Sequence, residues 1–376
     1  MSQFKFELIY QSKKSLARVG KIHTPHGVID TPCFVPVGTN AAIKAVDSQL
    51  VGVLDLPLIF CNTYHLIIQP GAETIQQAGG LHTFMNRTKP IITDSGGFQV
   101  FSLMYGSVHD ELKSRGAKKH ANTVMRINEE GVLFRSYKDG APIFLTPESS
   151  VQAQKKLGAD IIIPLDELPP YHTTTEQLQQ SFERTHRWEK RSLEEHKKNI
   201  NQQAMYAVIH GGLDQELRKK SACSLSELGF EGYAIGGSLG KTQEDMLSML
   251  TTLMPHIPTH APRHLLGIGE ARSVDAIIKL GIDTFDSSYP TRCARHGLLF
   301  THAGAIKIRQ ARYKNICEPL DGSCACYTCK NYSAAYLHHL FKAHELSAYT
   351  LASIHNLYVM AVLMQNYRQK ILDDLI

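Results

Sequence analysis

The chain has 376 residues, of which 43% are hydrophobic and 20% are charged. A chain of this length and composition buries a large core, which excludes a disordered polymer, a collagen and a small disulfide scaffold. Forty lysines and arginines against 35 aspartates and glutamates leave a formal net charge of +5, a mild excess that permits nucleic-acid binding without requiring it.

The N-terminal segment does not resemble an export signal. It reads MSQFKFELIY, without a basic stretch leading into an apolar one, and no later apolar run approaches the roughly 18 residues of a membrane span. We therefore expect a cytoplasmic protein without membrane contact. Residues 4–9 and 27–30 are predicted to form a small antiparallel hairpin that caps the main fold.

Short apolar runs that end in a polar residue or glycine recur along the chain, as is typical of buried parallel strands. They are residues 90–94, 161–166, 205–210, 233–237, 265–269 and 282–286. Helix-like segments separate them, for example 174–199 and 214–227, and the charged run 186–191 is expected to be a solvated helix face.

Strands that alternate with helices over about 250 residues favour a TIM (β/α)8 barrel, here assigned to residues 1–310 together with the hairpin cap. A doubly wound parallel sheet is the alternative. It would carry a G-x-G-x-x-G turn after an early strand, and none occurs before residue 90.

Three of the eight cysteines crowd into six residues, Cys324, Cys326 and Cys329, and His355 follows 26 residues later. Three thiolates and one imidazole complete a tetrahedral set for one structural Zn²⁺ per chain, with no open position for catalysis. The alternative is three free thiols and a core histidine. Competing fourth ligands are His338, His339 and His344. We expect residues 311–376 to form a zinc-binding subdomain with C-terminal helices packed on the barrel.

Three aspartates end predicted strands: Asp94, Asp166 and Asp286. In a barrel these strand ends converge on one mouth, where carboxylates can act as nucleophile, acid/base and base-reader. A single aspartate at a strand end is more often a helix cap. Three of them beside Gly-Gly pairs indicate a site.

With these motifs, the sequence resembles the bacterial-type tRNA-guanine transglycosylases, the queuine tRNA-ribosyltransferase family. The matching stretches are residues 36–39, 62–66, 93–99, 232–237, 286 with 290–292, and the zinc motif through 355–356. The resemblance covers nearly the whole chain. It implies a TIM barrel with a C-terminal zinc subdomain, and a pentosyltransferase that exchanges guanine 34 of tRNA for a 7-deazaguanine base in queuosine modification. The implied substrates are the Asp, Asn, His and Tyr tRNAs, which have a G34 U35 anticodon.

The resemblance also implies roles for single residues. Asp286 matches the nucleophile that would hold the ribose covalently, and Asp94 matches the general acid/base. Residues implied to bind the base are Phe98, Asp166, Leu168, His210 and Gly237. Asp166 would accept from the N1 and exocyclic amine of the base, the Gly237 amide would donate to its carbonyl oxygen, and Phe98 would stack on it unless it is an ordinary core aromatic.

Three departures from the family pattern lie around the implied base pocket. His210 stands where a glutamine is usual, Leu168 stands where bacterial members have cysteine, and Lys241 lies near an expected glutamate. That glutamate helps to receive the cationic aminomethyl group of the precursor base preQ1, which a lysine would repel. The departures therefore favour queuine as the incoming base. A preQ1-inserting enzyme with local drift is the alternative.

The charge excess is concentrated in residues 292–330, which contain seven basic residues and two acidic ones. The residues expected to hold tRNA phosphates are Arg292, Arg295, Lys307, Arg309 and Arg312. Downstream, four residues at helical spacing predict one stripe, Tyr332, Tyr336, His339 and Leu340. Core packing is the plain interpretation of this stripe. The resemblance favours an aromatic contact in a homodimer.

Three other functions are alternatives. A non-catalytic tRNA-binding partner subunit would lack the three carboxylates that this chain has. An archaeal-type transglycosylase would carry an added C-terminal RNA-binding domain, which is not found in these 376 residues. A metal-dependent barrel hydrolase would need histidine and carboxylate ligands at the strand ends, and no H-x-H motif follows the first predicted strand.

Overall fold

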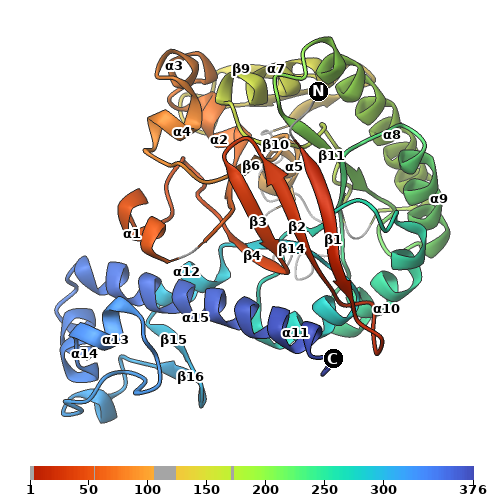
Figure 1. The fold of residues 1–376 in the computed structure, drawn as a ribbon. Coiled ribbons are helices and arrows are strands. Elements are labelled where there is room, and N and C mark those ends of the chain that lie inside the picture. Colours follow the sequence, from red (N-terminus) through yellow and green to blue (C-terminus); the bar gives the residue numbers. More distant parts are fainter. Residues whose placement is uncertain (1–3, 55, 106–123, 171–172) are drawn as a thin grey trace.

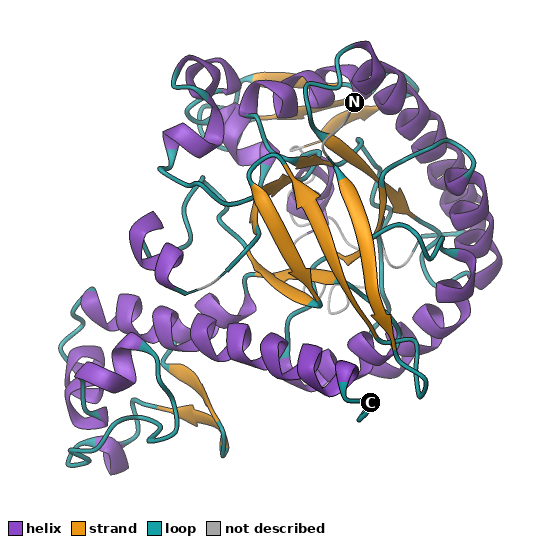
Figure 2. Cartoon of the chain, in the orientation of Figure 1, coloured by secondary structure: helices purple, strands orange, loops and turns teal. Residues whose placement is uncertain are grey.

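The centre of the protein is a parallel barrel of eight strands, seen in a computed structural model that describes residues 4–54, 56–105, 124–170 and 173–376. Helices surround it (Figures 1 and 2). In spatial order the strands are β4 (Cys33–Pro36), β14 (Thr284–Ser287), β13 (Arg263–Leu265), β12 (Gly232–Ile235), β11 (Ala204–Ile209), β10 (Ile161–Ile162), β6 (Ile91–Thr93) and β5 (Ile59–Cys61). A parallel bridge between Val37 and Phe60 joins β4 to β5 and closes the ring. The predicted TIM-barrel class is confirmed.

Six of the eight barrel strands were predicted, and β4 and β5 were not. Both are short and buried on both faces, and both lie between the predicted cap residues and the first predicted strand. Length does not explain the omission, because the predicted strands β6 and β13 are also only three residues long.

Side chains of the barrel strands alternate between two cores. In β11, Ala204, Tyr206 and Val208 join the cluster that fills the barrel, and the residues between them join the layer beneath the helices. All six are buried, because the strand has a packed layer on each face. This explains why the strands appear as continuous apolar runs in the sequence.

The helices around the barrel follow the strands in chain order. They are α1 (Ser48–Val53), α2 (Thr63–Ile68), α3 (Ala72–Gln77), α4 (Gly80–Phe84), α5 (Gly97–Tyr105), α7 (Pro147–Leu157), α8 (Thr175–Lys198), α9 (Gln215–Ser226), α10 (Gln243–Leu253), α11 (Ala271–Lys279) and α12 (Tyr289–Arg295). A three-stranded antiparallel sheet that was not predicted lies between α5 and α7: β7 (Val124–Ile127), β8 (Val132–Arg135) and β9 (Pro142–Leu145).

The N-terminal cap is a three-stranded antiparallel sheet of β1 (Lys5–Gln11), β2 (Arg18–Thr24) and β3 (Gly27–Thr31), in front of the barrel in Figure 1. The predicted hairpin is wrong in its pairing, because residues 4–9 and 27–30 both flank β2 and do not pair with each other. Strand β2 was not predicted, because Arg18, Gly20 and Lys21 interrupt its apolar pattern. Ile22 and Ile29 from the cap join the core inside the barrel, so the cap closes the end where the strands begin.

A buried ion pair fastens the cap to the barrel. The Arg18 guanidinium donates to both carboxyl oxygens of Asp283, at 2.9 and 2.5 Å, and also to the carbonyls of Thr259 and Ala261. Both side chains are almost completely buried, at 1% and 0% exposure. Asp283 immediately precedes β14, so this pair links β2 to the strand that carries Asp286.

Replacing Arg18 by alanine is expected to lower the free energy of unfolding by about 3–5 kcal/mol, because Asp283 would be left as a buried, uncompensated charge. Urea denaturation at neutral pH measures this loss. Lys21→Ala is the matched control. Lys21 lies on β2 like Arg18 and pairs with Asp30 at 2.6 Å, but its side chain is 42% exposed. Its replacement should lower the free energy of unfolding by less than about 1 kcal/mol. Equal losses for the two variants would contradict the prediction.

The C-terminal residues form a smaller unit beside the barrel (Figure 1). It contains β15 (Leu298–Thr301), β16 (Gly304–Lys307), α13 (Tyr327–Asn331), α14 (Ala334–Lys342) and the start of α15 (Ser347–Leu372). These elements share a separate hydrophobic cluster, whose members include Ala294, Leu299 and Ile308. The predicted division at residues 310 and 311 stays a prediction.

Helix α15 connects this unit to the barrel. Of its residues, Ile354, Leu357 and Met360 belong to the main core, whereas Leu351 belongs to the smaller cluster. Among the described helices, α15 alone is long and apolar enough to span a membrane, but 61% of its most apolar window is buried in the protein. A core helix of a globular protein passes the same test.

Candidate functional site

The predicted site residues gather where the barrel strands end. Asp286 lies within β14, Asp94 follows β6 directly, Asp166 follows β10, His210 follows β11, and Gly237 is two residues beyond β12. Because the strands are parallel and the cap covers their other end, these residues share the open mouth of the barrel.

Asp94 is held by a dense set of hydrogen-bond donors. Its carboxyl oxygens accept from the Asn62 amide at 2.6 Å, the Thr63 backbone N–H at 2.8 Å, the Gln99 amide at 2.8 Å and the Gly96 N–H at 3.2 Å. Burial nevertheless raises the pKa of Asp94 to about 6, because the desolvation cost outweighs these donors. A carboxyl group that titrates near neutral pH can both give and take a proton under working conditions.

Asp286 is anchored through one oxygen only. Its Oδ1 contacts His264 Nε2 at 3.2 Å and accepts from the Gly267 N–H at 3.0 Å, whereas Oδ2 has no hydrogen bond to any residue in the described ranges. His264 is fully buried, and its Nδ1 lies 2.8 Å from Thr284 Oγ1. This arrangement fixes the carboxyl and leaves Oδ2 free to react. His264 was not predicted as a site residue, although it directly precedes a predicted strand.

Asp166 lies between two partners. Its Oδ1 accepts from Ser95 Oγ at 3.1 Å, and its Oδ2 lies 3.4 Å from His210 Nε2. Through Ser95 it neighbours Asp94, whose pKa its charge helps to raise. Phe98, on α5, is 51% exposed and therefore available for stacking, not part of the core. Leu168 is half-buried against the cluster that contains Trp188.

The wall formed by Gly237 depends on a buried arginine. Arg218, on α9, donates to the carbonyls of Ile209 at 2.6 Å, Gly212 at 2.9 Å and Ser238 at 2.9 Å, and so ties together the turns after β11 and β12. Gly237 has a φ of +76°, a conformation that favours glycine. A narrow pocket here is lined by Glu167, Leu178, Phe182, His210, Gly212, Gly237 and Ser238.

The predicted solvated face at residues 186–191 is wrong in part. Trp188 and Glu189 are completely buried, while Arg187 and Lys190 are exposed. Glu189 reaches the base-pocket side of α8, where its Oε1 lies 4.0 Å from His210 Nε2. The helical spacing of the buried positions 182, 185, 189, 192 and 196 was the signal that could have identified it.

The basic residues predicted to meet RNA lie on α12 and on the segment that follows it. Arg292, Lys307, Arg309 and Arg312 are exposed, and Arg295 is half-buried. Three of the guanidinium groups lie over aromatic rings: Arg292 over Tyr289, Arg309 over Phe341 and Arg312 over Tyr313. Aromatic contacts of this kind restrict long side chains while leaving their charge available.

The predicted aromatic stripe is only partly one surface. Tyr332 precedes α14 and stacks on Tyr336, with ring centroids 5.5 Å apart. Tyr336 and His339 are exposed, but Leu340 is buried in the cluster of the smaller unit. Leu340 therefore packs in the core, as the plain interpretation of the stripe had it.

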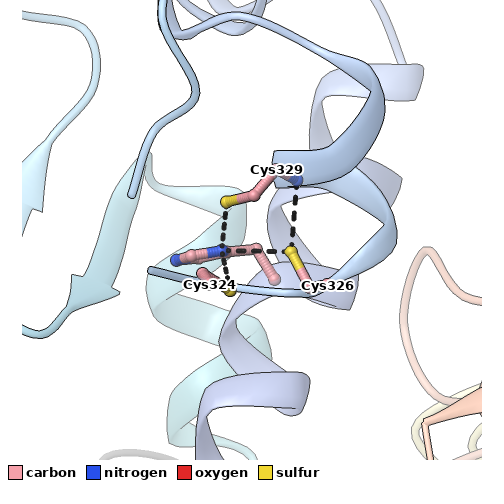
Figure 3. A group of neighbouring side chains, drawn as sticks. Cys324, Cys326 and Cys329 are labelled. Atoms are coloured by element: carbon pink, nitrogen blue, oxygen red, sulfur yellow. Dashed lines mark hydrogen bonds between the residues drawn. The ribbon is translucent and has the colours of Figure 1, made fainter. Parts of the chain in front are cut away.

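The cysteine cluster has the geometry of a metal site. The sulfurs of Cys324, Cys326 and Cys329 converge on His355 Nδ1, at 3.7, 3.4 and 3.4 Å (Figure 3). A tetrahedral zinc ion with ordinary Zn–S and Zn–N bonds would set these sulfur–nitrogen edges at about 3.6 Å. The opposite ring nitrogen, Nε2, lies 2.6 Å from the Phe300 carbonyl, which fixes the tautomer that presents the Nδ1 lone pair to the sulfurs. The four residues can hold a metal ion.

A second cluster combines His26, His82 and Asp160 near the cap. The two imidazoles stack with centroids 3.5 Å apart and planes 13° apart, and each faces a different oxygen of Asp160. A ring nitrogen binds a metal along its in-plane lone pair, so stacked rings cannot aim at one ion unless one ring turns. We assign no metal to this cluster.

Comparisons with known proteins cover almost the whole chain. A family model described as "Queuine tRNA-ribosyltransferase" matches residues 12–376. Queuine tRNA-ribosyltransferase of Protochlamydia amoebophila is 59% identical over 376 residues, covering 100% of this chain and 97% of that protein. Those of Chlamydia caviae and Chlamydia trachomatis are 55% and 53% identical, each covering 98% of this chain and 99% of the relative.

Proposed function

The chain belongs to the queuine tRNA-ribosyltransferase family and is a pentosyltransferase of tRNA, and on this premise we propose that it exchanges guanine 34 through a covalent link between Asp286 and the ribose. The observation that carries the proposal is the one-sided anchoring of Asp286. Its Oδ1 is held by His264 and Gly267, so Oδ2 is positioned to attack C1′. The bond from C1′ to guanine breaks as the bond from C1′ to Oδ2 forms.

Asp94 serves as the acid/base in this proposal. In the protonated form it gives its proton to the departing guanine, and as a carboxylate it then takes a proton from the incoming base, which displaces Asp286 from C1′. The neutral-range pKa that burial gives Asp94 suits both steps.

We expect kcat for base exchange to fall below about pH 6, by roughly tenfold per pH unit, because a protonated Asp94 cannot accept the proton of the incoming base. Above that pH the ionised Asp94 has no proton for the departing guanine, so kcat should fall again and the profile should be bell-shaped. Exchange of labelled guanine into tRNA at saturating substrate, with folding checked by circular dichroism at each pH, measures this. A flat kcat down to pH 5 in the folded enzyme would remove Asp94 from this role.

The base itself is recognised by residues at the neighbouring strand ends. Asp166 accepts from the two adjacent donors of the base, the Gly237 N–H and His210 donate to its carbonyl oxygen, and Phe98 stacks on its face. Leu168 packs beside this pocket, and the Arg218 guanidinium fixes the backbone of its wall.

Queuine is the proposed incoming base. Lys241 lies in the loop after β12 and is exposed, and a lysine in this loop would repel the ammonium of preQ1. The loop is also rich in glycine, and Gly240 has a φ of +102°, a conformation that side chains beyond glycine rarely adopt.

We therefore expect queuine to displace labelled guanine from tRNA at least about tenfold more efficiently than preQ1, as judged by kcat/KM. Lys241→Glu should reduce this ratio by raising kcat/KM for preQ1, because a carboxylate attracts the preQ1 ammonium that the lysine repels. Guanine-for-guanine exchange by the same variant is the control. Efficient exchange of preQ1 together with none of queuine would assign the enzyme to preQ1 insertion. If neither base displaces guanine, the chain would be a non-catalytic partner subunit.

The remaining proposals concern partners. Phosphates of the anticodon loop would contact Arg292, Arg295, Lys307, Arg309 and Arg312, so affinity for tRNA should fall with salt. The proposed substrates are tRNAs with a G34 U35 anticodon. The four residues of the cysteine cluster would hold one structural zinc ion, which supplies rigidity and no reacting group. The homodimer and the cytoplasmic location stay predictions.

A further inference from the structure

A carboxyl group without a conventional partner lies behind the base pocket. Glu189 is 0% exposed, and neither of its oxygens makes a hydrogen bond of ordinary geometry to a residue in the described ranges. The Val208 backbone makes only a weak contact with it. Burying a carboxyl in this way is costly unless a nearby group shares its proton or its charge.

The imidazole of His210 lies within 4.0 Å of the Glu189 carboxyl. The Nε2 atom of His210 faces two carboxyl groups, with Asp166 Oδ2 at 3.4 Å and Glu189 Oε1 at 4.0 Å. The Nδ1 atom lies on the side of Gly237, since a Cβ placed on Gly237 would be 3.5 Å from it. The imidazole therefore spans the space between two acids and the place where the base carbonyl is proposed to bind.

The other charged groups around His210 have partners of their own. Glu167, in the loop after β10, pairs with Arg184 of α8 at 2.6 Å. Arg218 of α9 is bound to three carbonyls, and Lys220 lies over the Phe182 ring. His186 of α8 contacts Ser221, and burial lowers its pKa to about 4, so it is neutral at pH 7. Within the described ranges, His210 is the group placed to exchange a proton with Glu189.

We propose that Glu189 is a positioning residue that shares one proton with His210, and that base binding moves this proton onto His210 and leaves Glu189 ionised. The inference rests on the proposed function, since it takes His210 to donate to the base carbonyl. Because Nε2 faces acids, it keeps a hydrogen. Nδ1 can then donate only if the ring is an imidazolium, and the Glu189 carboxylate balances that charge. The proton passes from carboxyl to imidazole, so none is taken from solvent.

The state without base is consistent with this transfer. Burial, with the neighbouring charge of Asp166, raises the pKa of Glu189 well above its ordinary value. Glu189 therefore holds the proton before the base arrives. A glutamine in place of His210 would donate to the base carbonyl while neutral and would need no proton from Glu189. The buried acid is therefore useful only together with the histidine.

The test compares E189Q, H210Q and the double variant in base exchange from about pH 5.5 to pH 8.5. Glutamine matches the shape of a protonated Glu189 but has no proton to give. In the His210 background we expect E189Q to raise KM for the base about 10- to 100-fold, with KM for tRNA unchanged. The pH at which KM for the base begins to rise should move down by about one unit or more, because the imidazolium loses its counter-charge. In the H210Q background E189Q should change KM for the base less than about twofold.

An equal effect of E189Q in both backgrounds, or an unshifted pH profile in folded protein, would overturn the pairing. Thermal melting of each variant verifies folding. If E189Q does not fold, Glu189→Asp, which keeps a carboxyl further from the ring, replaces it and should show a smaller shift of the same sign. Failure of the proposed function is distinguishable, because the wild type would then exchange no guanine at any pH.

Discussion

Replacing Asp286 by asparagine is expected to abolish base exchange, with a loss in kcat of about four to six orders of magnitude, as when a nucleophile is removed from other enzymes with covalent intermediates. Asparagine keeps the shape and the anchoring of Oδ1 by Gly267, so the protein should stay folded and bind tRNA. What is lost is the anionic Oδ2 that is proposed to attack C1′.

The covalent intermediate gives the direct measurement. Wild-type enzyme mixed with tRNA should give a protein–RNA adduct that survives denaturation, and Asp286→Asn should give none. Asp166→Asn is the matched control, because it removes a buried carboxylate from the same mouth without removing the nucleophile. It should weaken base recognition but still form the adduct. An adduct from Asp286→Asn would identify another nucleophile.

The barrel and the place of the carboxylates at its mouth could be predicted because they follow from local patterns. Apolar runs with Asp94 and Asp286 at their ends mark parallel strands whose ends converge, whatever the side chains around them do. The strands β4 and β5 were missed, although they are no shorter than β6 and β13, which were predicted. A barrel of eight was inferred from six strands because strands and helices alternate over about 250 residues.

The residues that hold the carboxylates in place could not be predicted from the sequence. His264 contacts Asp286 across two adjacent strands, 22 residues apart in the chain, so their meeting depends on strand register. The four donors to Asp94 come from the segments that begin α2 and α5, which meet only in the folded barrel. Long-range contacts of this kind leave no periodic signal in one sequence.

Glu189 shows how charge misleads. It stands among Arg187, Lys190 and Arg191, and such a run is usually solvated. The helix turns 100° per residue, however, so two cations of this run face solvent while the acid between them faces the barrel. The helical spacing of Glu189 from the other buried positions predicts its burial better than the charge of its neighbours does.

Removing one ligand of the cysteine cluster is expected to have the largest effect on stability. Structural zinc binds isolated zinc-finger peptides with about 10–16 kcal/mol, which matches or exceeds the net stability of a typical domain. Cys326→Ser should therefore unfold the unit of β15, β16, α13 and α14, whose own hydrophobic cluster is small. Metal content should fall from one zinc ion per chain toward none, and thermal melting should show a separate early transition.

Loss of the zinc ion should also disturb the candidate active site, because α15 contacts the segment around it. His355 is bound to the Phe300 carbonyl, and the next residue, Asn356, accepts from the Phe300 N–H and donates to the carbonyls of Pro290 and Leu298. Pro290 lies in α12, which begins three residues after Asp286 and carries Arg292. Loosening of His355 therefore frees the helix that follows the proposed nucleophile, and both tRNA binding and exchange should fall.

Cys317→Ser is the matched control for this loss. Cys317 is an exposed free thiol seven residues before Cys324, outside the cluster, so its replacement should leave zinc content, melting and exchange unchanged. Chelation of zinc from the wild type should reproduce the Cys326→Ser melting profile, since both remove the same cross-link. A Cys326→Ser protein that kept its zinc, or that melted like the wild type after losing it, would show that packing alone holds this unit together.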